Sequence, residues 1–239
     1  MLPEFLLPPV ASIGSMDPLF PSLVPTDIVG AIAIVITVLV ASFLIGSIPW
    51  GVVISRMFFR KDIRSEGSGN IGATNAARTL GKRGAASVFL LDFGKGILAG
   101  WFALACSTML GAFQEELAPL AMAFSFAGVI SGHVFSPWLG FKGGKGISAG
   151  VGNIFFTFGP IWALLELALF IVIVLVSKYV SAGSVAAAVA APFVALATYW
   201  GHWLAVIVIT IGALIIIWAH RGNISRLKNG TESRIGGRK

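Results

Sequence analysis

The sequence predicts an all-α, polytopic membrane protein with seven transmembrane helices, of which the fourth is short. Of the 239 residues, 56% are hydrophobic and only 11% are charged, whereas a soluble domain is about 25% charged. The mean hydropathy is +0.91, and most apolar runs approach the roughly 20 residues that a helical membrane crossing needs. This composition excludes a large soluble domain and a disordered regulator. A single cysteine, Cys106, excludes an internal disulfide scaffold.

Residues 1–27 differ in composition from the rest of the chain. They contain six of the eleven prolines and no Lys or Arg. A secretory signal peptide begins with a positively charged region, and this segment has none. We therefore expect an irregular, proline-rich N-terminal extension.

The first apolar run begins at residue 28 and continues to residue 59, with Pro49 predicted to bend it near its end. The later runs cover 86–110, 118–139, 147–158, 160–177, 180–199 and 203–219. Run 147–158 would make only about 18 Å of helix, which is too short for a hydrocarbon core of about 30 Å. We expect it to be a short helix sunk in the bundle or a re-entrant segment.

The charged residues predict the orientation of these spans. The N-terminal segment carries only acidic residues, whereas Lys and Arg concentrate in loop 60–85, loop 140–147 and tail 220–239. Positively charged loops stay in the cytoplasm, so the N-terminus should lie outside and the tail inside. This requires an odd number of crossings, and we count seven within a membrane domain of residues 28–219. The net charge of +7 then reflects orientation, and we expect no nucleic-acid partner.

The first polar stretch, residues 64–78, has the composition of an anion-binding loop. Its glycines are Gly67, Gly69 and Gly72, its neutral donors are Ser68, Asn70, Thr74 and Asn75, and it ends on Arg78. Glycines let backbone N–H groups approach a ligand, and an arginine can grip a phosphate with two parallel hydrogen bonds. The spacing also matches a dinucleotide fingerprint, which needs a preceding strand in a parallel sheet that this sequence does not predict. A flexible solvated connector is the alternative interpretation.

The second stretch combines Gly132-His133 at the end of a span with residues 141–146. Lys142 and Lys145 stand among Gly143, Gly144 and Gly146. This is not a Walker A motif, because Lys145 is followed by glycine and not by Ser or Thr. The glycine turn opens an apolar helix, whose N-terminus favours anions. The two lysines could instead be a positive-inside anchor, and His133 a structural hydrogen-bonding residue.

The third stretch follows the last span, at residues 220–232. His220 and Asn223 are three residues apart and can share one face of a helix. Arg226 could be an ordinary snorkelling residue, and Glu232 lies further along the tail. We interpret the stretch as a third contribution to one anion site.

The spans themselves contain few charges. Asp92 and Lys95 are three apart and should pair inside the bundle, because an unpaired charge in lipid is costly. The pair could be purely structural or could support the site. Glu166 has no partner in the sequence. No metal-binding or nucleophile-elbow motif is present, and the spacing of common lipid acyltransferases is also missing. Two classes of protein remain: an enzyme that joins a phosphorylated headgroup to a lipid chain, and a transporter of glycerol phosphate or a related phosphorylated anion.

Six motifs in order, over about residues 40–232, resemble the PlsY family of bacterial acyl-phosphate:glycerol-3-phosphate acyltransferases. They are Gly46-Ser47-Ile48-Pro49, Gly67–Arg78, Leu91-Asp92-x-x-Lys95-Gly96, Gly132-His133, Phe141–Gly146 and His220–Glu232. The resemblance implies a seven-span enzyme of the bacterial cytoplasmic (inner) membrane, with catalytic loops 60–85 and 140–147. It also implies direct transfer of an acyl group from acyl-phosphate to the 1-hydroxyl of glycerol 3-phosphate, which gives lysophosphatidic acid and phosphate.

The resemblance also implies roles for individual residues. The expected catalytic residues are Ser68, Arg78, Lys142, Lys145, His220 and Asn223. The expected substrate-binding residues are Gly67, Gly69, Asn70, Thr74, Asn75, His133, Gly143, Gly144, Gly146, Arg226 and Glu232. No metal or cofactor is expected, the partners are the two substrates and membrane lipid, and a monomer is favoured. The proton of the attacking hydroxyl would pass to a substrate phosphate, with His220 as the alternative base.

Overall fold

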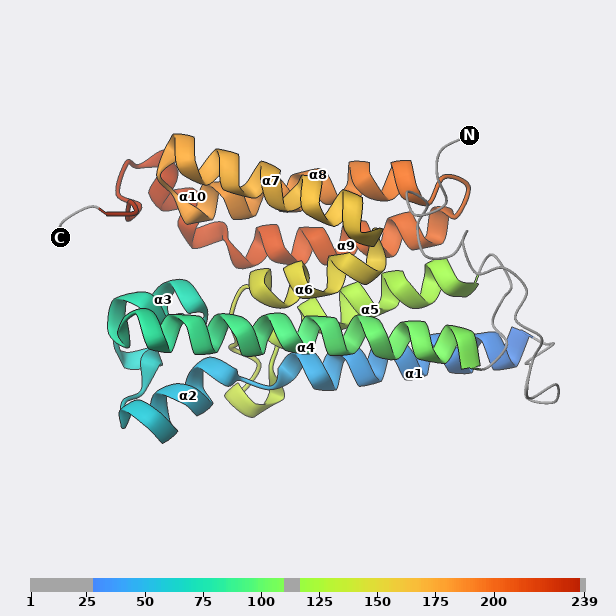
Figure 1. Ribbon diagram of the computed structural model, residues 1–239, viewed down its shortest axis with the longest axis horizontal. Helices are drawn as coiled ribbons and strands as arrows, with labels where there is room; N and C mark the ends of the chain where they lie inside the picture. The colour runs from blue at the N-terminus through green and yellow to red at the C-terminus, as the bar shows by residue number, and fades with distance from the viewer. Residues whose placement is uncertain (1–27, 110–116, 237–239) are drawn as a thin grey trace.

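The computed structural model describes residues 28–109 and 117–236, and every regular element in these ranges is a helix (Figure 1). The elements are α1 (Ile28–Ser47), α2 (Trp50–Phe59), η2 (Ile63–Ser65), α3 (Ala73–Thr79), α4 (Gly81–Met109), α5 (Leu117–Val134), η3 (Pro137–Leu139), α6 (Ile147–Thr157), α7 (Gly159–Ser177), α8 (Val180–Thr198), α9 (Trp203–Ala219) and α10 (Arg221–Lys228). The all-α prediction is confirmed. Lipid offers no hydrogen-bonding partners to the backbone, and a helix forms its backbone hydrogen bonds internally.

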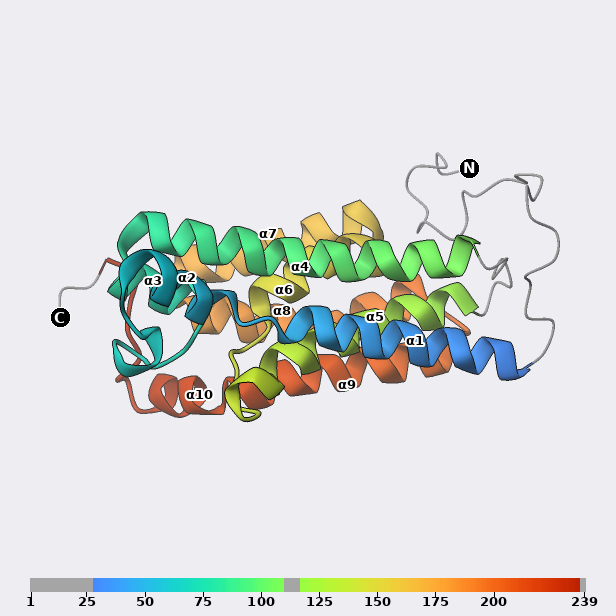
Figure 2. The ribbon, with the colours of Figure 1, turned by 90° about the horizontal axis from the view of Figure 1, so that it is seen from below.

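The long helices lie roughly side by side, as two perpendicular views show (Figures 1 and 2). By length and composition, five of the described segments could cross a membrane, or six if α9 and α10 count as one span bent by 54°. α6 is a shorter apolar helix of 11 residues. In Figure 1, α6 joins α7 well before the level at which α4 ends and α5 begins. The chain is therefore a multi-pass membrane protein, while seven crossings and their orientation stay predictions.

The predicted bend at Pro49 is a complete break between α1 and α2. The break frees the carbonyl of Ile48, which accepts a hydrogen bond of 2.8 Å from Lys95 Nζ on α4. Lys95 also lies 2.7 Å from Asp92 Oδ1, so the pairing predicted from the sequence is confirmed. Both side chains are almost fully buried, at 3% and 2% exposure. The pair therefore faces the bundle interior and fixes the kink of the first span.

α5 occupies the middle of the bundle, in contact with α1, α4, α6 and α9. Its contact with α1 is close because glycines stand at the interface, as is common between membrane helices. A Cβ atom on Gly132 would collide with the backbone of Phe43, and one on Gly46 would collide with that of Val129. This packing holds the end of α5, and the loop that follows it, in a fixed position.

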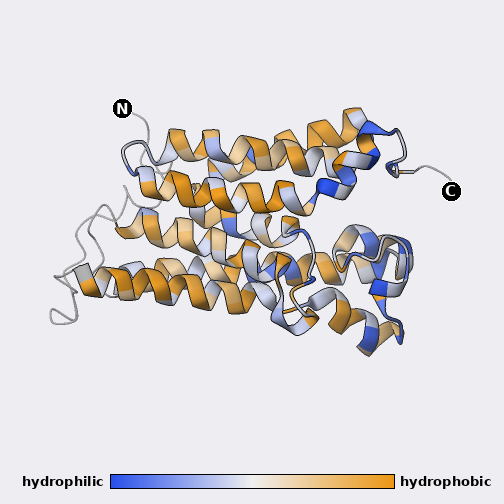
Figure 3. Cartoon of the chain, turned by 180° about the vertical axis from the view of Figure 1, so that it is seen from behind, coloured by the Kyte–Doolittle hydropathy of each residue, from blue (hydrophilic) through white to orange (hydrophobic). Residues whose placement is uncertain are grey.

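The polar segments collect at one end of the bundle. Figure 3 shows the hydrophilic residues around α3, α10 and the C-terminal segment, while the long helices are mainly hydrophobic. Ile235 N donates to Lys178 O at 2.8 Å, which ties the tail to the turn between α7 and α8 at this same end. The segments rich in glycine and basic residues therefore share one end of the molecule. Residues 1–27 and 110–116, which carry the acidic residues used to predict the outer face, lie outside the described residues.

Candidate functional site

The first loop is organised by the buried side chain of Asn75 on α3. Its Oδ1 accepts a hydrogen bond of 2.8 Å from Ser68 N, and its Nδ2 lies 2.9–3.1 Å from the carbonyl oxygens of Ile63, Glu66 and Asn70. Gly67 adopts a φ of +61°, a conformation open to glycine at little cost. Asn75 was predicted to bind substrate, but in the structure its side-chain amide forms hydrogen bonds within the loop. These hydrogen bonds give the loop a defined conformation in which Ser68 is exposed. This argues against the alternative interpretation as a flexible connector.

Three basic residues around this loop, Arg56, Lys61 and Arg64, already have carboxylate partners. Asp62 Oδ2 lies 2.8 Å from Arg56 and 2.7 Å from Arg64, and Lys61 lies 3.2 Å from Glu66. The hydrogen bonds from Arg64 and then Arg56 hold the pKa of the Asp62 carboxyl well below its usual range. Arg78, exposed on α3, makes no ion pair within residues 28–109 and 117–236. Its guanidinium is therefore available to an anionic ligand.

The second loop is a glycine turn that lies against the end of α5. Gly143 N and Gly144 N donate to the carbonyl oxygens of Val134 and His133, at 2.9 and 3.0 Å. A Cβ atom on Gly144 would collide with the ring of His133. Gly146 then caps α6 with a φ of +81°. The predicted helix after the turn is confirmed, and Lys142 remains exposed beside it.

His133 lies beneath this loop and not at the surface. Its side chain is 3% exposed, with Nδ1 2.9 Å from Lys95 Nζ and 3.7 Å from Asp92 Oδ1. The three side chains form a buried cluster under the glycine turn. The structure thus favours the structural alternative for His133, in which it positions Gly144 instead of contacting substrate itself.

The third stretch joins the second through Lys145. The Nζ of Lys145 donates to Asn223 Oδ1 on α10. Asn223 Nδ2 in turn donates to Glu232 Oε1 at 2.7 Å, and Arg226 Nε lies 2.7 Å from Glu232 Oε2. These four residues, together with Ser181 at 2.9 Å from Glu232 Oε1, form what we call the Lys145 network.

The ionisation of the network follows from its contacts. Burial raises the pKa of the Glu232 carboxyl, but hydrogen bonds from Asn223, Arg226 and Ser181 outweigh burial, so its net pKa is lowered. Burial also lowers the pKa of Lys145 to about 8, with repulsion from Arg226 and Arg78 acting in the same direction and Glu232 opposing it. A Cβ atom built on Gly144 would lie 3.1 Å from the side chain of Ile71, so the first loop packs against the second. All three predicted stretches converge.

His220 stands at the junction of α9 and α10, with a side chain that is 3% exposed. Its Nδ1 lies 2.8 Å from the carbonyl oxygen of Ile216. Burial lowers the pKa of His220 to about 4, and the charge of Lys145 adds to the effect. The imidazole is therefore neutral at pH 7 and a weak base.

One member of the Lys145 network, Ser181, was not singled out from the sequence. It lies near the start of an apolar run and carries no motif, so only its contact with Glu232 reveals it. Lys95, predicted to pair with Asp92 or to support the site, does pair with Asp92 and also contacts His133. Within the described residues, no group of His, Cys, Asp and Glu could hold a metal ion.

Chemically, the converged loops form a site for phosphorylated anions. Lys145 and Arg226 belong to a network with a single carboxylate, Glu232, and Arg78 and Lys142 are exposed on the first and second loops, which leaves an excess of positive charge. Arginine and lysine side chains of this kind bind phosphate groups strongly. The site also lies at the end of an apolar helical bundle, where a lipid chain is accessible.

Comparison with known proteins decides which family uses this site. The family model described as "Glycerol-3-phosphate acyltransferase" matches residues 36–230. The chain belongs to the glycerol-3-phosphate acyltransferase family. A relative from Maricaulis maris is 45% identical over 82% of this chain and 85% of its own length, and one from Syntrophomonas wolfei is 39% identical over 82% and 95%. Both relatives are named glycerol-3-phosphate acyltransferase.

Solved structures of this family share the fold. PlsY (YgiH), an integral membrane glycerol 3-phosphate acyltransferase, superposes with a TM-score of 0.72 and 33% identity in its glycerol 3-phosphate form, over 86% of this chain and 96% of that one. Its lysophosphatidic acid form gives 0.69 and 32%, over 86% and 95%. The resemblance predicted from the motifs is confirmed. Of the two classes left open by the sequence, family membership selects the acyltransferase enzyme over the transporter.

Proposed function

We propose that this acyltransferase uses acyl-phosphate as the donor and acylates the 1-hydroxyl of glycerol 3-phosphate. The products are lysophosphatidic acid and inorganic phosphate. One observation carries the proposal: Lys145 of the second loop donates to Asn223 of the third stretch, while Ile71 of the first loop packs against Gly144 beside Lys145. Three cationic segments around one site suit a reaction in which both substrates carry a phosphate.

The main task of such an enzyme is to hold two anions against each other. Acyl-phosphate is a mixed anhydride whose carbonyl is already activated, so no covalent nucleophile is needed. Positioning the substrates and offsetting their repulsion supplies the catalysis. Arg78, Lys142 and Lys145 provide the positive charge, and Gly143 and Gly144 let the backbone come close to a phosphate. Ser68, Asn70 and Thr74 add neutral donors from the first loop.

In the proposed step, the 1-hydroxyl oxygen forms a bond to the acyl carbonyl carbon, and the bond from that carbon to the phosphate oxygen breaks. The phosphate leaves with the electron pair of that bond. The hydroxyl proton passes to a phosphate oxygen of the substrate. This route is favoured over His220 as base, because the buried imidazole has a pKa of about 4. The phosphate is the stronger base, since phosphate monoesters have a second pKa of about 6.

The remaining predicted residues hold the site together in this proposal. Asn75, Gly67 and Gly69 shape the first loop, His133 and Gly146 shape the second, and Asn223 with Arg226 and Glu232 anchors the third. We place loops 60–85 and 140–147 and tail 220–239 on the cytoplasmic side of the bacterial inner membrane, in a seven-span monomer whose proline-rich residues 1–27 lie outside. Cysteine variants of Ser68 and Arg226, in a Cys106→Ser background, should not react with an impermeant thiol reagent in intact cells.

The donor is tested with purified protein in detergent. Acyl-phosphate and labelled glycerol 3-phosphate should give labelled lysophosphatidic acid and one phosphate per product. Parallel assays with acyl-coenzyme A or with acylated acyl carrier protein should give no labelled lysophosphatidic acid. Product from either thioester, with none from acyl-phosphate, would overturn the proposed donor while leaving the family assignment intact.

Direct transfer is tested separately at Ser68, the exposed hydroxyl of the first loop. Ser68→Ala should retain measurable acyl transfer, because the hydroxyl serves only as a donor to phosphate. Mass spectrometry of enzyme quenched during turnover should find no acyl-serine. An acyl group trapped on Ser68 would replace direct transfer by a two-step mechanism.

A further inference from the structure

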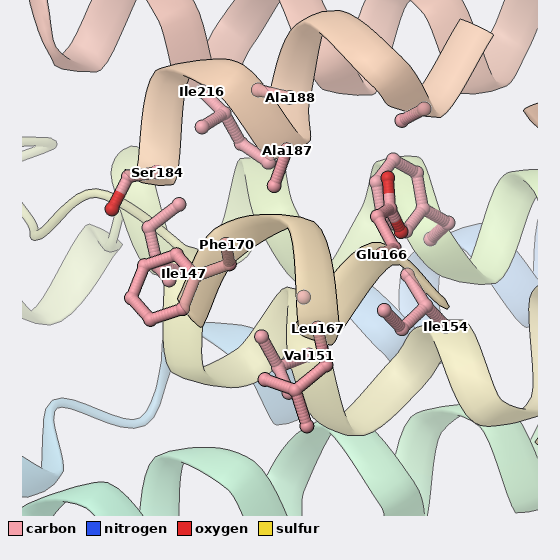
Figure 4. A pocket seen from close by; sticks show the side chains of 13 residues that line it. Ile147, Val151, Ile154, Glu166, Leu167, Phe170, Ser184, Ala187, Ala188 and Ile216 are labelled. Atoms are coloured by element: carbon pink, nitrogen blue, oxygen red, sulfur yellow. The ribbon is translucent and has the colours of Figure 1, made fainter. Parts of the chain in front are cut away.

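A pocket of almost wholly apolar lining lies between α6, α7 and α8 (Figure 4), and residues close in sequence to the Lys145 network line one end of it. Its lining includes Ile147, two residues after Lys145, and Ser184, one helical turn after Ser181. Ile216, which also lines it, supplies the carbonyl that contacts His220. The elements next to the network, α6, α8 and α9, therefore form this end of the pocket.

Glu166 lies at the other end of the pocket. In Figure 4, Ile147 and Ser184 lie at one end and Ile154 and Glu166 at the opposite end. Ile147 and Ile154 are seven residues apart on α6, so the two ends are separated by about 10 Å along that helix. The pocket thus leads from the anion site to a carboxyl group inside the bundle.

The Glu166 side chain has no hydrogen bond or ion pair with any other residue of the described chain, although the residue is only 6% exposed. The reaction proposed above does not use it. A buried carboxyl needs a polar partner, whatever its charge. An alkyl chain pushed against it would remove access to any such partner and offer none in return.

We propose that Glu166 is a specificity-determining residue that limits how far the acyl chain of the donor enters this pocket. This inference rests on the proposed function, because the chain belongs to the acyl-phosphate. The carbons nearest the carbonyl are buried between α6, α7 and α8. Carbons beyond the depth of Glu166 leave the pocket and gain nothing further from it.

The test is the dependence of kcat/KM on chain length, measured with a series of saturated acyl-phosphates in detergent. Each buried methylene should raise kcat/KM about three- to fourfold, until the chain reaches Glu166 and the profile becomes flat. In Glu166→Leu the rise should continue for longer chains, giving roughly a tenfold gain over the wild-type plateau. Glu166→Gln keeps a polar group and should retain the wild-type plateau.

A second variant addresses the pocket without altering the carboxyl. Ala188 lines the pocket and is 4% exposed. Ala188→Leu should move the plateau to shorter chains, because the larger side chain fills part of the path. A wild-type profile in a folded Glu166→Leu overturns the role of Glu166, whatever Ala188→Leu shows. If Glu166→Leu does not fold, a wild-type profile in Ala188→Leu overturns the inference, because the chain then does not occupy this pocket. A wild-type enzyme inactive with every acyl-phosphate would instead overturn the proposed donor.

Discussion

Lys145 and Asn223 are 78 residues apart in the chain, yet the ammonium group of one donates to the side-chain oxygen of the other. Asn223 passes the connection on to Glu232, at 2.7 Å. The contact joins the glycine turn before α6 to the helix after the last span. Two short polar segments, separated by three long apolar helices, are thereby joined into one hydrogen-bonded network.

The charge of Lys145 should give the enzyme an upper pH limit. Its pKa is lowered to about 8, so the cation is present below that pH and is lost as the pH rises through it. We expect kcat/KM, which reports on the free enzyme, to fall above pH 8. Lys145→Arg should move this fall upward, because arginine keeps its proton. An unchanged upper limit in that variant would show that another group titrates.

Arg78 should contribute most of the charge stabilisation supplied by the first loop. Arg78→Ala is expected to lower kcat/KM by about 10²-fold or more, which corresponds to about 3 kcal/mol of lost electrostatic stabilisation. Arg83→Ala is the matched control, since Arg83 is an exposed arginine at the start of α4 and should change the rate little. Near-normal turnover in Arg78→Ala would remove Arg78 from the site.

Asn75 should matter through the shape of its loop and not through contact with substrate. Asn75→Ala leaves Ser68 N and the three carbonyls that the side chain contacts without their partner, and should cost about 2–4 kcal/mol of stability. Asn75→Asp keeps the acceptor for Ser68 N but faces those carbonyls with a carboxylate, so it should be no better than alanine. Ser65→Ala, at an exposed hydroxyl of the same loop, serves as control. Thermal unfolding in detergent measures the difference, and an Asn75→Asp variant as stable as wild type would contradict this role.

The Asp92–Lys95 pair should be strongly coupled in stability. Lys95→Met leaves a buried carboxylate without its cation, at a cost of about 3–5 kcal/mol. The double variant Asp92→Leu, Lys95→Met should recover part of that loss, because neither charge is then stranded. Lys61→Met, at the exposed pair with Glu66, should cost at most about 1 kcal/mol. Additive losses in the double-mutant cycle would contradict direct coupling.

Much of the fold and most of the candidate site could be predicted from the sequence. Apolar runs predicted the helices, because lipid requires a backbone that satisfies its own hydrogen bonds. The short run after Lys145 predicted a short helix, sunk in the bundle or re-entrant, and α6 has 11 residues. The three-residue spacing of Asp92 and Lys95 predicted their ion pair. Composition also marked the three polar stretches, because Lys and Arg are sparse in the apolar runs between them.

The tertiary structure alone decided what each polar residue contacts. It turned Asn75 inward to organise its loop, buried His133 under the glycine turn, and added Ser181 to the network. It also placed Glu166 at the far end of a pocket that begins beside Ile147. None of these contacts follows a local period or motif, because each depends on how helices distant in sequence pack against one another. The sequence determined which polar side chains the protein has, and the packing of the helices determined what each of them contacts.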